Sequence, residues 1–226
     1  MQIKHKIYFL SFIIAQVLNL FSCENKNHSK EIKQETPYTF PDYVDTTKFL
    51  KQSEVLDFIN KAPTIRINRT GAGSPFDKLN FNKVIAYDYV GTLGSSAEII
   101  EFYNATTKLI YKQKSLTEKQ ASYVIRELTN KNNYGDGVAS CFNPHLAFVF
   151  FQNDNLVQVV EICMDCNYLI STISIPNMFH SKVNVGTRNE YSNVGFTPQG
   201  KRVIKKICKE LSLAYGNISE ETLKSH

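Results

Sequence analysis

The sequence has little net charge and lacks the patterns of several common functional classes. Its 226 residues include 26 Lys and Arg and 21 Asp and Glu, which gives a formal net charge of +5 at pH 7. This excess is too mild and too scattered to indicate nucleic-acid binding. No Ser/His/Asp or paired-carboxylate pattern indicates a hydrolase, and Gly71-Ala72-Gly73 precedes no Gly-Lys-Ser/Thr sequence that would hold a phosphate. The sequence therefore predicts no reaction, and the expectation is a non-catalytic protein.

The chain also lacks a hydrophobic run long enough to cross a membrane comfortably. Residues 1–22 have a short basic start and then an apolar segment from about Ile7 to Phe21, which Gln16 and Asn19 interrupt. A segment of this length and pattern is typical of a removed export signal and not of a transmembrane helix. We therefore expect residues 1–22 to be a signal peptide.

The end of this leader carries a lipidation pattern. The sequence Leu20-Phe21-Ser22-Cys23 resembles the lipobox of bacterial lipoproteins, in which a leucine and a small residue precede a cysteine that becomes lipidated. The resemblance implies that Cys23 carries acyl chains such as palmitate, each buried methylene contributing about 0.8 kcal/mol to membrane anchoring. The alternative is an ordinary cleaved signal with a chance cysteine. The expected location is the bacterial cell envelope, at the outer membrane or the periplasmic face.

The mature chain is expected to form one α+β domain behind a tether. Residues 23–45 consist of the lipidated cysteine and a polar stretch that cannot bury enough apolar area to order itself. As a random coil, this stretch would reach about 25 Å. The domain is predicted over residues 46–216, as an antiparallel sheet of four to six strands packed by about three helices, and residues 217–226 form a tail.

Local patterns predict the elements of this domain. Thr117 and Gln120 form a capping box, and apolar residues at i, i+3, i+4 and i+7 follow, so a helix is predicted over 117–129. Thr197 as a cap and Pro198 as the first helical residue predict a helix near 198–213, and a further helix is predicted near 47–61. Runs rich in β-branched and aromatic residues predict strands at 82–90, 98–103, 108–111 and 168–175. Over 98–103 the alternative is a short helix that a capping box of Ser95 and Glu98 would open.

A central hairpin is predicted from two runs of β-branched and aromatic residues, at about 146–151 and 156–163. Asn153-Asp154-Asn155 separates the runs, and these residue types tolerate left-handed turn conformations. The first run has apolar residues at both its odd and its even positions, which is typical of a strand buried on both faces. We therefore expect this hairpin at the centre of the sheet.

The predicted pairing gathers four chemically capable side chains at one end of the hairpin. With a three-residue turn, His145 lies opposite Cys163. With a turn one residue shorter or longer, Cys141 falls opposite Cys166. Pro144 cannot donate to a strand ladder, so Cys141 is expected in the loop that leads into the first strand. Either register brings the three cysteines and His145 together.

Several chemistries could explain this cluster. A disulfide would persist outside the cytosol, and Cys141 with Cys166 is the first choice, with Cys163 as the other candidate. All three cysteines with His145 would make a Cys3His set suited to zinc. Thioredoxin-like exchange needs a cysteine at a helix N-terminus, whereas the residues that follow Cys166 are strand-like. Inert packed thiols are the remaining alternative.

Other polar side chains are weaker candidates. Tyr134 and Asp136 lie in the loop that leads to Cys141, but Asp136 has no identifiable partner and is typical of a turn. Cys208 lies in an apolar helical stripe and is expected to be a buried hydrophobic residue. Three more polar side chains, which no shared pattern unites, lie in a long loop over 177–193: His180, Arg188 and Tyr191.

Three segments together carry a family resemblance. SCFNPHLAFVF, EICMDCNYLIS and GFTPQGKRVIKKICKEL resemble a family of lipoproteins from Bacteroidetes-type bacteria. The resemblance implies a signal-anchored domain with a Cys-Phe-x-Pro lead-in and an Ile-Cys-x-x-Cys strand end, and it implies no activity. We therefore expect an envelope lipoprotein that binds a protein or small-molecule partner, with a cysteine-stabilised hairpin. The alternative is a zinc-binding or thiol-redox protein that uses the four clustered residues.

Overall fold

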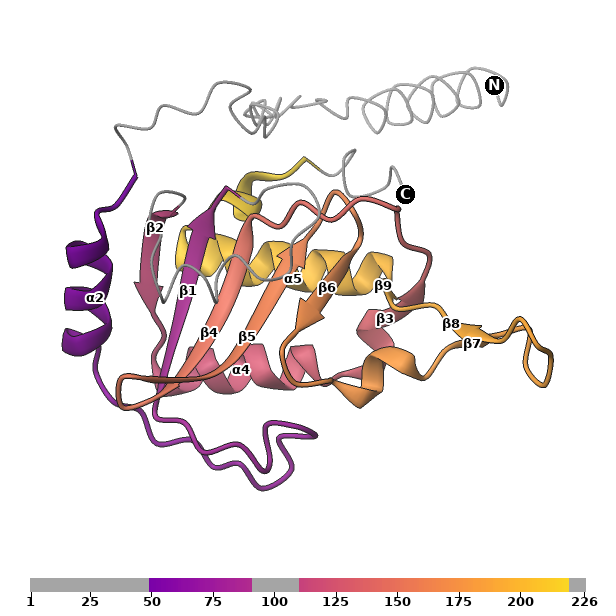
Figure 1. The fold of residues 1–226 in the computed structure, drawn as a ribbon, viewed down its shortest axis with the longest axis horizontal. Coiled ribbons are helices and arrows are strands. Elements are labelled where there is room, and N and C mark those ends of the chain that lie inside the picture. Colours follow the sequence, from indigo (N-terminus) through magenta and orange to yellow (C-terminus); the bar gives the residue numbers. More distant parts are fainter. Residues whose placement is uncertain (1–48, 91–109, 220–226) are drawn as a thin grey trace, which may run out of the picture. The chain divides into compact units, whose positions relative to one another are not determined.

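The fold is α+β, as the sequence predicts, and is built on a five-stranded antiparallel sheet (Figure 1). The computed structural model describes residues 49–90 and 110–219. Within these ranges the strand order is β2-β1-β4-β5-β6, and neighbouring strands run antiparallel. The strands are β1 (Lys83–Tyr89), β2 (Ile110–Ser115), β4 (Leu146–Gln152), β5 (Asn155–Cys163) and β6 (Tyr168–Ser171).

Helices cover both faces of this sheet. In the described ranges the α-helices are α2 (Gln52–Lys61), α4 (Glu118–Leu128) and α5 (Pro198–Leu211). Helices α4 and α5 lie side by side across one face, and α2 lies at the β2 end of the sheet (Figure 1). The number of helices agrees with the prediction of about three.

The two parities of β4 supply two separate cores. Phe148 and Phe150 belong to the core between the sheet and helices α4 and α5. Ala147 and Val149 belong to a second core, which includes buried residues of α2. The strand is therefore buried on both faces, and the predicted central position of the β4–β5 hairpin is confirmed.

The turn of this hairpin is tighter than predicted. Gln152 pairs with Asn155, so the turn consists of Asn153 and Asp154 and not of three residues. Asn153 has a φ of +55°, in the left-handed region that asparagine tolerates better than most residues.

A β-bulge compensates for the shorter turn. The pairing of β4 with β5 shifts between Phe150 and Phe151. Beyond the bulge Leu146 pairs with Ile162, and the His145 N–H donates to the Ile162 carbonyl at 3.3 Å. At its cysteine end the hairpin therefore has the register that was predicted for the three-residue turn.

Threonine caps begin two of the helices. The Oγ1 of Thr117 accepts the Gln120 N–H at 3.3 Å, and the Thr117 N–H donates to Gln120 Oε1 at 3.0 Å, which confirms the predicted capping box. The Oγ1 of Thr197 accepts the Gly200 N–H at 3.1 Å at the start of α5.

The first helix, α2, is shorter than predicted and begins at Gln52. The carboxylate of Glu54 accepts the Lys51 N–H at 2.6 Å and caps the helix there.

Several short elements were not predicted. The segment over 177–193 is not a plain loop, because it contains part of a 3-10 helix and two paired strands, and β6 ends four residues before the predicted end of the strand over 168–175. The short elements are η2 (Lys131–Asn133), β3 (Tyr134–Asp136), η3 (Pro176–Phe179), β7 (Lys182–Val183), β8 (Tyr191–Ser192), β9 (Gly195–Phe196) and η4 (Ala214–Asn217).

Some predictions lie outside the described residues. These are the signal peptide over 1–22, Cys23 and the tether over 23–45, and the predicted strand over 98–103. Among the residues with described positions, no helix has both the length and the apolar character needed to cross a membrane.

Candidate functional site

A four-residue turn at the end of β5 positions two of the candidate cysteines. Cys163 is the last residue of β5, and Cys166 lies in the turn that leads to β6. Asn167 closes this turn with a φ of +62°, and its side-chain amide donates to the Gly137 carbonyl at 2.7 Å. The turn is therefore tied to the loop that precedes β4.

Two contacts hold the third cysteine, Cys141, beside this turn. The Ala139 N–H donates to the Cys166 carbonyl at 3.0 Å. The ring of Phe142 packs on the ring of Tyr168, with 4.9 Å between their centroids. Because these contacts lie on either side of Cys141 in the chain, the position of its backbone is fixed relative to Cys166.

The Cys166 sulfur lies next to the sulfurs of both other cysteines. Cys163 and Cys166 form a disulfide, with 5.2 Å between their Cα atoms, and both are buried. The Sγ of Cys141 lies 3.0 Å from the Sγ of Cys166, and Cys141 is exposed. The bonded pair is therefore not the pair that the sequence favours, Cys141 with Cys166. The short turn places Cys163 and Cys166 within bonding reach of each other, and Cys141 remains a neighbouring thiol.

Two polar groups interact with the sulfurs of these cysteines. The Cys166 N–H donates to the Sγ of Cys163 at 3.2 Å. Burial raises the pKa of the Tyr168 phenol, and charge on Cys141 raises it further. Phe142 packs in one apolar cluster with the two bonded cysteines, and the buried polar residue Asn167 follows Cys166 in the turn.

His145, which the predicted register sets opposite Cys163, contacts Tyr89 and Tyr215. Its Nδ1 is 3.3 Å from the carbonyl oxygen of Tyr89, and its ring meets the ring of Tyr215 edge-on. Burial lowers the pKa of His145 to about 4, and the contact with the Tyr89 carbonyl opposes this effect. In the ranges 49–90 and 110–219, no group of three or more His, Cys, Asp or Glu side chains is placed to hold a metal ion. The predicted zinc set of Cys141, His145, Cys163 and Cys166 is thus a prediction without a supporting geometry.

The other predicted residues have structural contacts. The hydroxyl of Tyr134 donates to the Leu128 carbonyl at 2.7 Å, and the carboxylate of Asp136 accepts the Gly137 N–H at 2.9 Å, as a turn aspartate does. Cys208 is fully buried, and burial raises the pKa of its thiol well above the usual value. Three polar residues lie in or beside the β7–β8 hairpin: His180, Arg188 and Tyr191.

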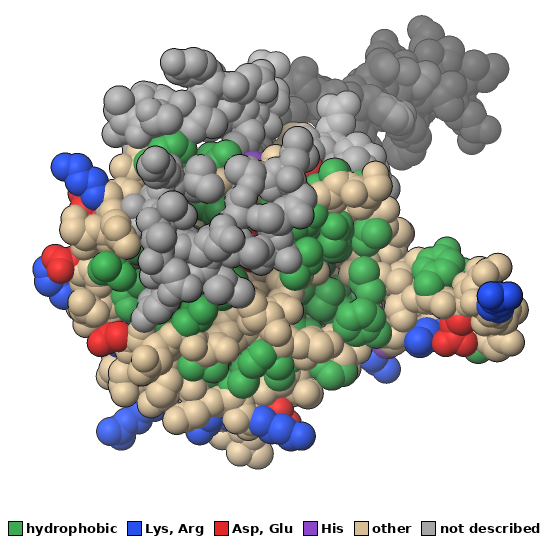
Figure 2. Space-filling model, in the orientation of Figure 1, with side chains coloured by type: hydrophobic (Ala, Val, Ile, Leu, Met, Phe, Trp, Pro, Cys, Tyr) green, Lys and Arg blue, Asp and Glu red, His purple; other side chains and the backbone are tan. Residues whose placement is uncertain are grey.

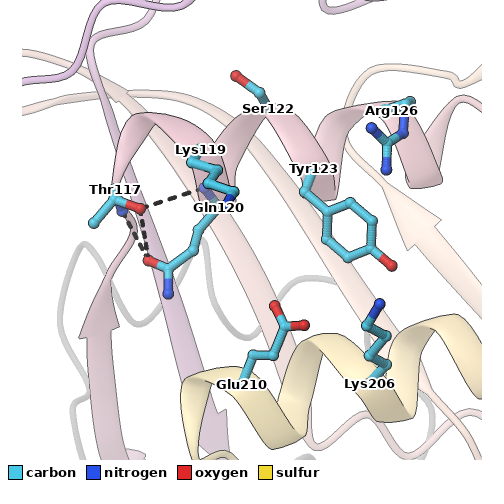
Figure 3. A pocket seen from close by; sticks show the side chains of 8 residues that line it. All are labelled: Thr117, Lys119, Gln120, Ser122, Tyr123, Arg126, Lys206 and Glu210. Carbon is cyan, nitrogen blue, oxygen red and sulfur yellow. Dashed lines mark hydrogen bonds between the residues drawn. The ribbon is translucent and has the colours of Figure 1, made fainter.

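Sequence patterns gave no sign of a surface groove between α4 and α5. The groove has a volume of about 830 Å³ and combines basic, hydroxyl and aromatic side chains (Figure 3). The ring of Tyr123 lies between two cations, 4.8 Å from the Arg126 guanidinium carbon and 5.6 Å from the Lys206 Nζ. Its lining residues are Thr117, Lys119, Gln120, Ser122, Tyr123, Arg126, Lys206 and Glu210.

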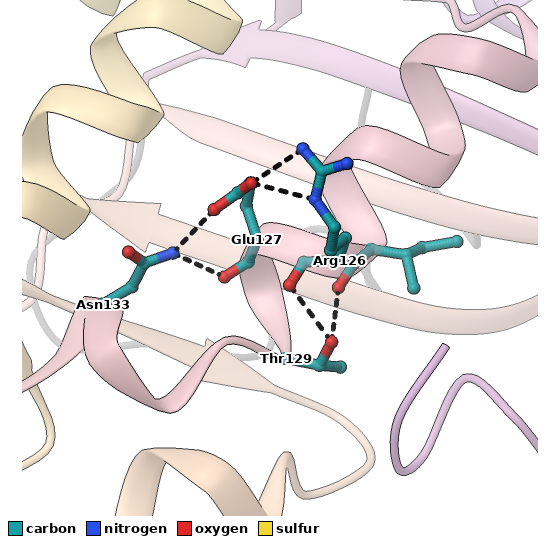
Figure 4. Close-up of polar contacts among 5 residues, drawn as sticks. Arg126, Glu127, Thr129 and Asn133 are labelled. Atoms are coloured by element: carbon teal, nitrogen blue, oxygen red, sulfur yellow. Dashed lines mark hydrogen bonds and ion pairs between the residues drawn. The ribbon is translucent and has the colours of Figure 1, made fainter. Parts of the chain in front are cut away.

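A hydrogen-bond network positions one of these cations. The guanidinium of Arg126 donates twice to Glu127 Oε1, at 3.0 and 3.1 Å (Figure 4). The other carboxylate oxygen of Glu127 accepts from the side-chain amide of Asn133 at 3.2 Å, which also donates to the Glu127 carbonyl. The groove therefore has one cation, Arg126, that hydrogen bonds to Glu127 hold in place, and another, Lys206, that the neighbouring helix α5 supplies.

The opposite side of the molecule has an apolar surface. Figure 2 shows the face away from α4 and α5, where hydrophobic side chains gather beside β6. Val138, before the loop that contacts Cys166, is 47% exposed, and Ile173, beyond the far end of β6, is 36% exposed.

Comparisons with models of protein families, with curated proteins and with solved structures find no match to this chain.

Proposed function

We propose that this chain is a lipid-anchored protein of the bacterial envelope, with a non-catalytic binding domain whose sheet end is fixed by a disulfide. The observation that carries the proposal is the buried Cys163–Cys166 bridge. Disulfides persist in oxidising compartments and are rare in the cytosol. The leader that ends in Leu20-Phe21-Ser22-Cys23 would take the chain to such a compartment.

The bridge stabilises the turn by a modest amount. In the chain-entropy relation, a bridge that closes a four-residue loop contributes about 2 kcal/mol. Its main effect is local, because it holds the end of β5 against the start of β6. The same turn carries the contacts to Gly137 and Ala139, so the bridge also fixes the loop before β4.

Lipidation of Cys23 is tested on the full-length chain expressed in a bacterium with a lipoprotein export pathway. We expect the chain in the membrane fraction, with an N-terminal peptide that begins at Cys23 and carries the mass of acyl chains. Cys23→Ser is expected to lose the acyl mass, because serine has no thiol to accept the lipid. Cys208→Ser, at a buried position in α5, is the matched control and should keep it. A mature wild-type chain that begins elsewhere, without added lipid, would refute the anchor.

The groove between α4 and α5 is the surface that suits the binding part of this proposal. Its lining includes three cationic side chains, Lys119, Arg126 and Lys206, and one carboxylate, that of Glu210, while Arg126 also donates to the Glu127 carboxylate beside the groove. We infer that it binds the phosphate-bearing headgroups of an anionic membrane. The anchor would keep such headgroups within reach of the tether, and basic residues near an anionic surface contribute about 1 kcal/mol each.

The groove is tested with the mature chain, residues 24–226, without lipid. We expect it to sediment with vesicles that contain phosphatidylglycerol and not with pure phosphatidylcholine vesicles. Replacing Arg126 and Lys206 by glutamine should weaken binding about thirtyfold, from about 2 kcal/mol of lost attraction. The control replaces Lys51 and Lys61 of the α2 region, which changes the net charge equally and should leave binding near wild type. Equal weakening in both pairs would rule out the groove as the site.

A further inference from the structure

We propose that Cys141, Cys163 and Cys166 form a disulfide-exchange site in which Cys166 is the shared sulfur. The bridge moves between Cys163–Cys166, the pair bonded in the structure, and Cys141–Cys166. The proposal rests on the proposed function, because it requires the oxidised state of an exported protein. It adds an activity to a bridge that the proposed function treats as static.

The distance between the sulfurs suits the reaction. The Sγ of Cys141 lies 3.0 Å from the Sγ of Cys166, within the 3–3.5 Å that is typical of reacting atoms before bond formation. The hydrogen bond from Ala139 to the Cys166 carbonyl and the packing of Phe142 on Tyr168 hold the approach. No movement of a helix or strand is needed to bring the thiol to the bridge.

The exchange is balanced without an oxidant or a reductant. The Cys141 thiol loses its proton to solvent, and its thiolate attacks the Sγ of Cys166. The Cys141–Cys166 bond forms as the Cys163–Cys166 bond breaks, and Cys163 leaves with the electron pair and takes up a proton. The Cys166 N–H, which donates to the Cys163 Sγ at 3.2 Å, stabilises the charge on that leaving sulfur.

The two bridged forms differ in what they present to the surroundings. With Cys163 and Cys166 bonded, the free thiol is Cys141, which is exposed. With Cys141 and Cys166 bonded, the free thiol is Cys163, which is fully buried in this structure. Exchange therefore exposes or hides one reactive thiol, and only the first form reacts with a thiol reagent from outside.

The test uses the full-length chain, extracted from membranes in detergent and held at pH 7.5. An acid quench stops exchange because it removes the thiolate. Pepsin at low pH separates Cys141 from Cys163, and cyanogen bromide then cuts after Met164, between Cys163 and Cys166. Mass spectrometry of the linked peptides is expected to find both linkages, Cys163–Cys166 and Cys141–Cys166.

A prolonged incubation with excess iodoacetamide distinguishes exchange from a fixed mixture. The reagent removes the Cys141 thiol, so exchange drains the Cys141–Cys166 form until only Cys163–Cys166 with alkylated Cys141 remains. The rate of draining should rise about tenfold per pH unit below the pKa of the attacking thiol. In Cys163→Ser, a Cys141–Cys166 bridge should form in place of the original.

Two results would overturn exchange while leaving the proposed function intact. One is a Cys163–Cys166 linkage alone before alkylation, and the other is a Cys141–Cys166 fraction that persists throughout alkylation. Free Cys141 and Cys166 thiols in Cys163→Ser would also contradict it. A wild-type chain with no bridge among the three cysteines would instead remove the proposed function itself.

Discussion

Replacing Phe150 by alanine is expected to lower the free energy of unfolding by about 3–5 kcal/mol, which is the usual cost of removing a buried phenylalanine side chain. Phe150 is fully buried at the centre of β4. Its ring lies 5.0 Å from the ring of Phe76 and 5.2 Å from that of Phe81, between centroids. The cavity would therefore open beside the two remaining rings, those of Phe76 and Phe81, in the core between the sheet and helices α4 and α5.

Urea unfolding of the full chain measures this effect, and Phe179→Ala is the matched control. Phe179 is 46% exposed at the end of η3, so its replacement should change the free energy of unfolding by less than about 1 kcal/mol. Equal effects of the two variants would contradict the assigned core between the sheet and helices α4 and α5.

The second large expected effect is on the free energy of unfolding, which Asp88 near the end of β1 and His145 just before β4 should make depend on pH in opposite directions. Burial lowers the pKa of His145 to about 4 and raises the pKa of Asp88 to about 6. One Asp88 oxygen accepts the Ala214 N–H at 2.9 Å, and the charge of Lys112 also favours the ionised form, but burial outweighs both. Burial therefore makes the charged form of each group less favourable in the folded chain than in the unfolded chain.

The signs follow from which state binds the proton more tightly. The unfolded chain protonates His145 near pH 6.5 and the folded chain only near 4, so His145 costs about 3 kcal/mol of stability as the pH falls through this window. The folded chain protonates Asp88 near pH 6 and the unfolded chain near 3.8, so Asp88 costs about 3 kcal/mol as the pH rises through that window. The two contributions nearly cancel between pH 7 and pH 4.

Single variants should separate these contributions. Relative to wild type, Asp88→Asn is expected to lose about 3 kcal/mol more stability between pH 7 and pH 4, because only the His145 cost remains. His145→Gln should instead gain about 3 kcal/mol over the same interval. The measurement is the free energy of unfolding in urea at both pH values, and the double variant should follow wild type. Parallel curves for all four proteins would show that neither group is buried as the structure has it.

The sequence predicted those parts of the fold that depend on local chemistry. Thr117 with Gln120 and Thr197 with Pro198 mark helix starts because a cap acts on backbone groups within one turn. Apolar residues at both the odd and the even positions of β4 predicted burial on both faces, because successive side chains of a strand point to opposite faces. These signals do not require knowledge of what packs against them.

Features that depend on pairs of distant residues could not be predicted in this way. The bulge at Phe150 and Phe151 depends on how β4 and β5 fit between two cores, so the two-residue turn and its corrected register are not visible in sequence. The bonded cysteine pair depends on where the β5–β6 turn places its sulfurs relative to Cys141. The α4–α5 groove joins Tyr123 to Lys206, which are far apart in the chain and meet only through helix packing.

One bridge should form among the cysteines of the exported, anchored chain. The intact mass of the full-length chain, extracted from membranes, denatured and alkylated without reduction, tests this expectation. We expect a lipidated Cys23 and two alkylated cysteines, since one bridge blocks two of the remaining four whichever partner Cys166 has. Four alkylated cysteines would refute both the bridge and the proposed function, because all the sulfurs of the β5–β6 turn and its neighbouring loop would then be free thiols.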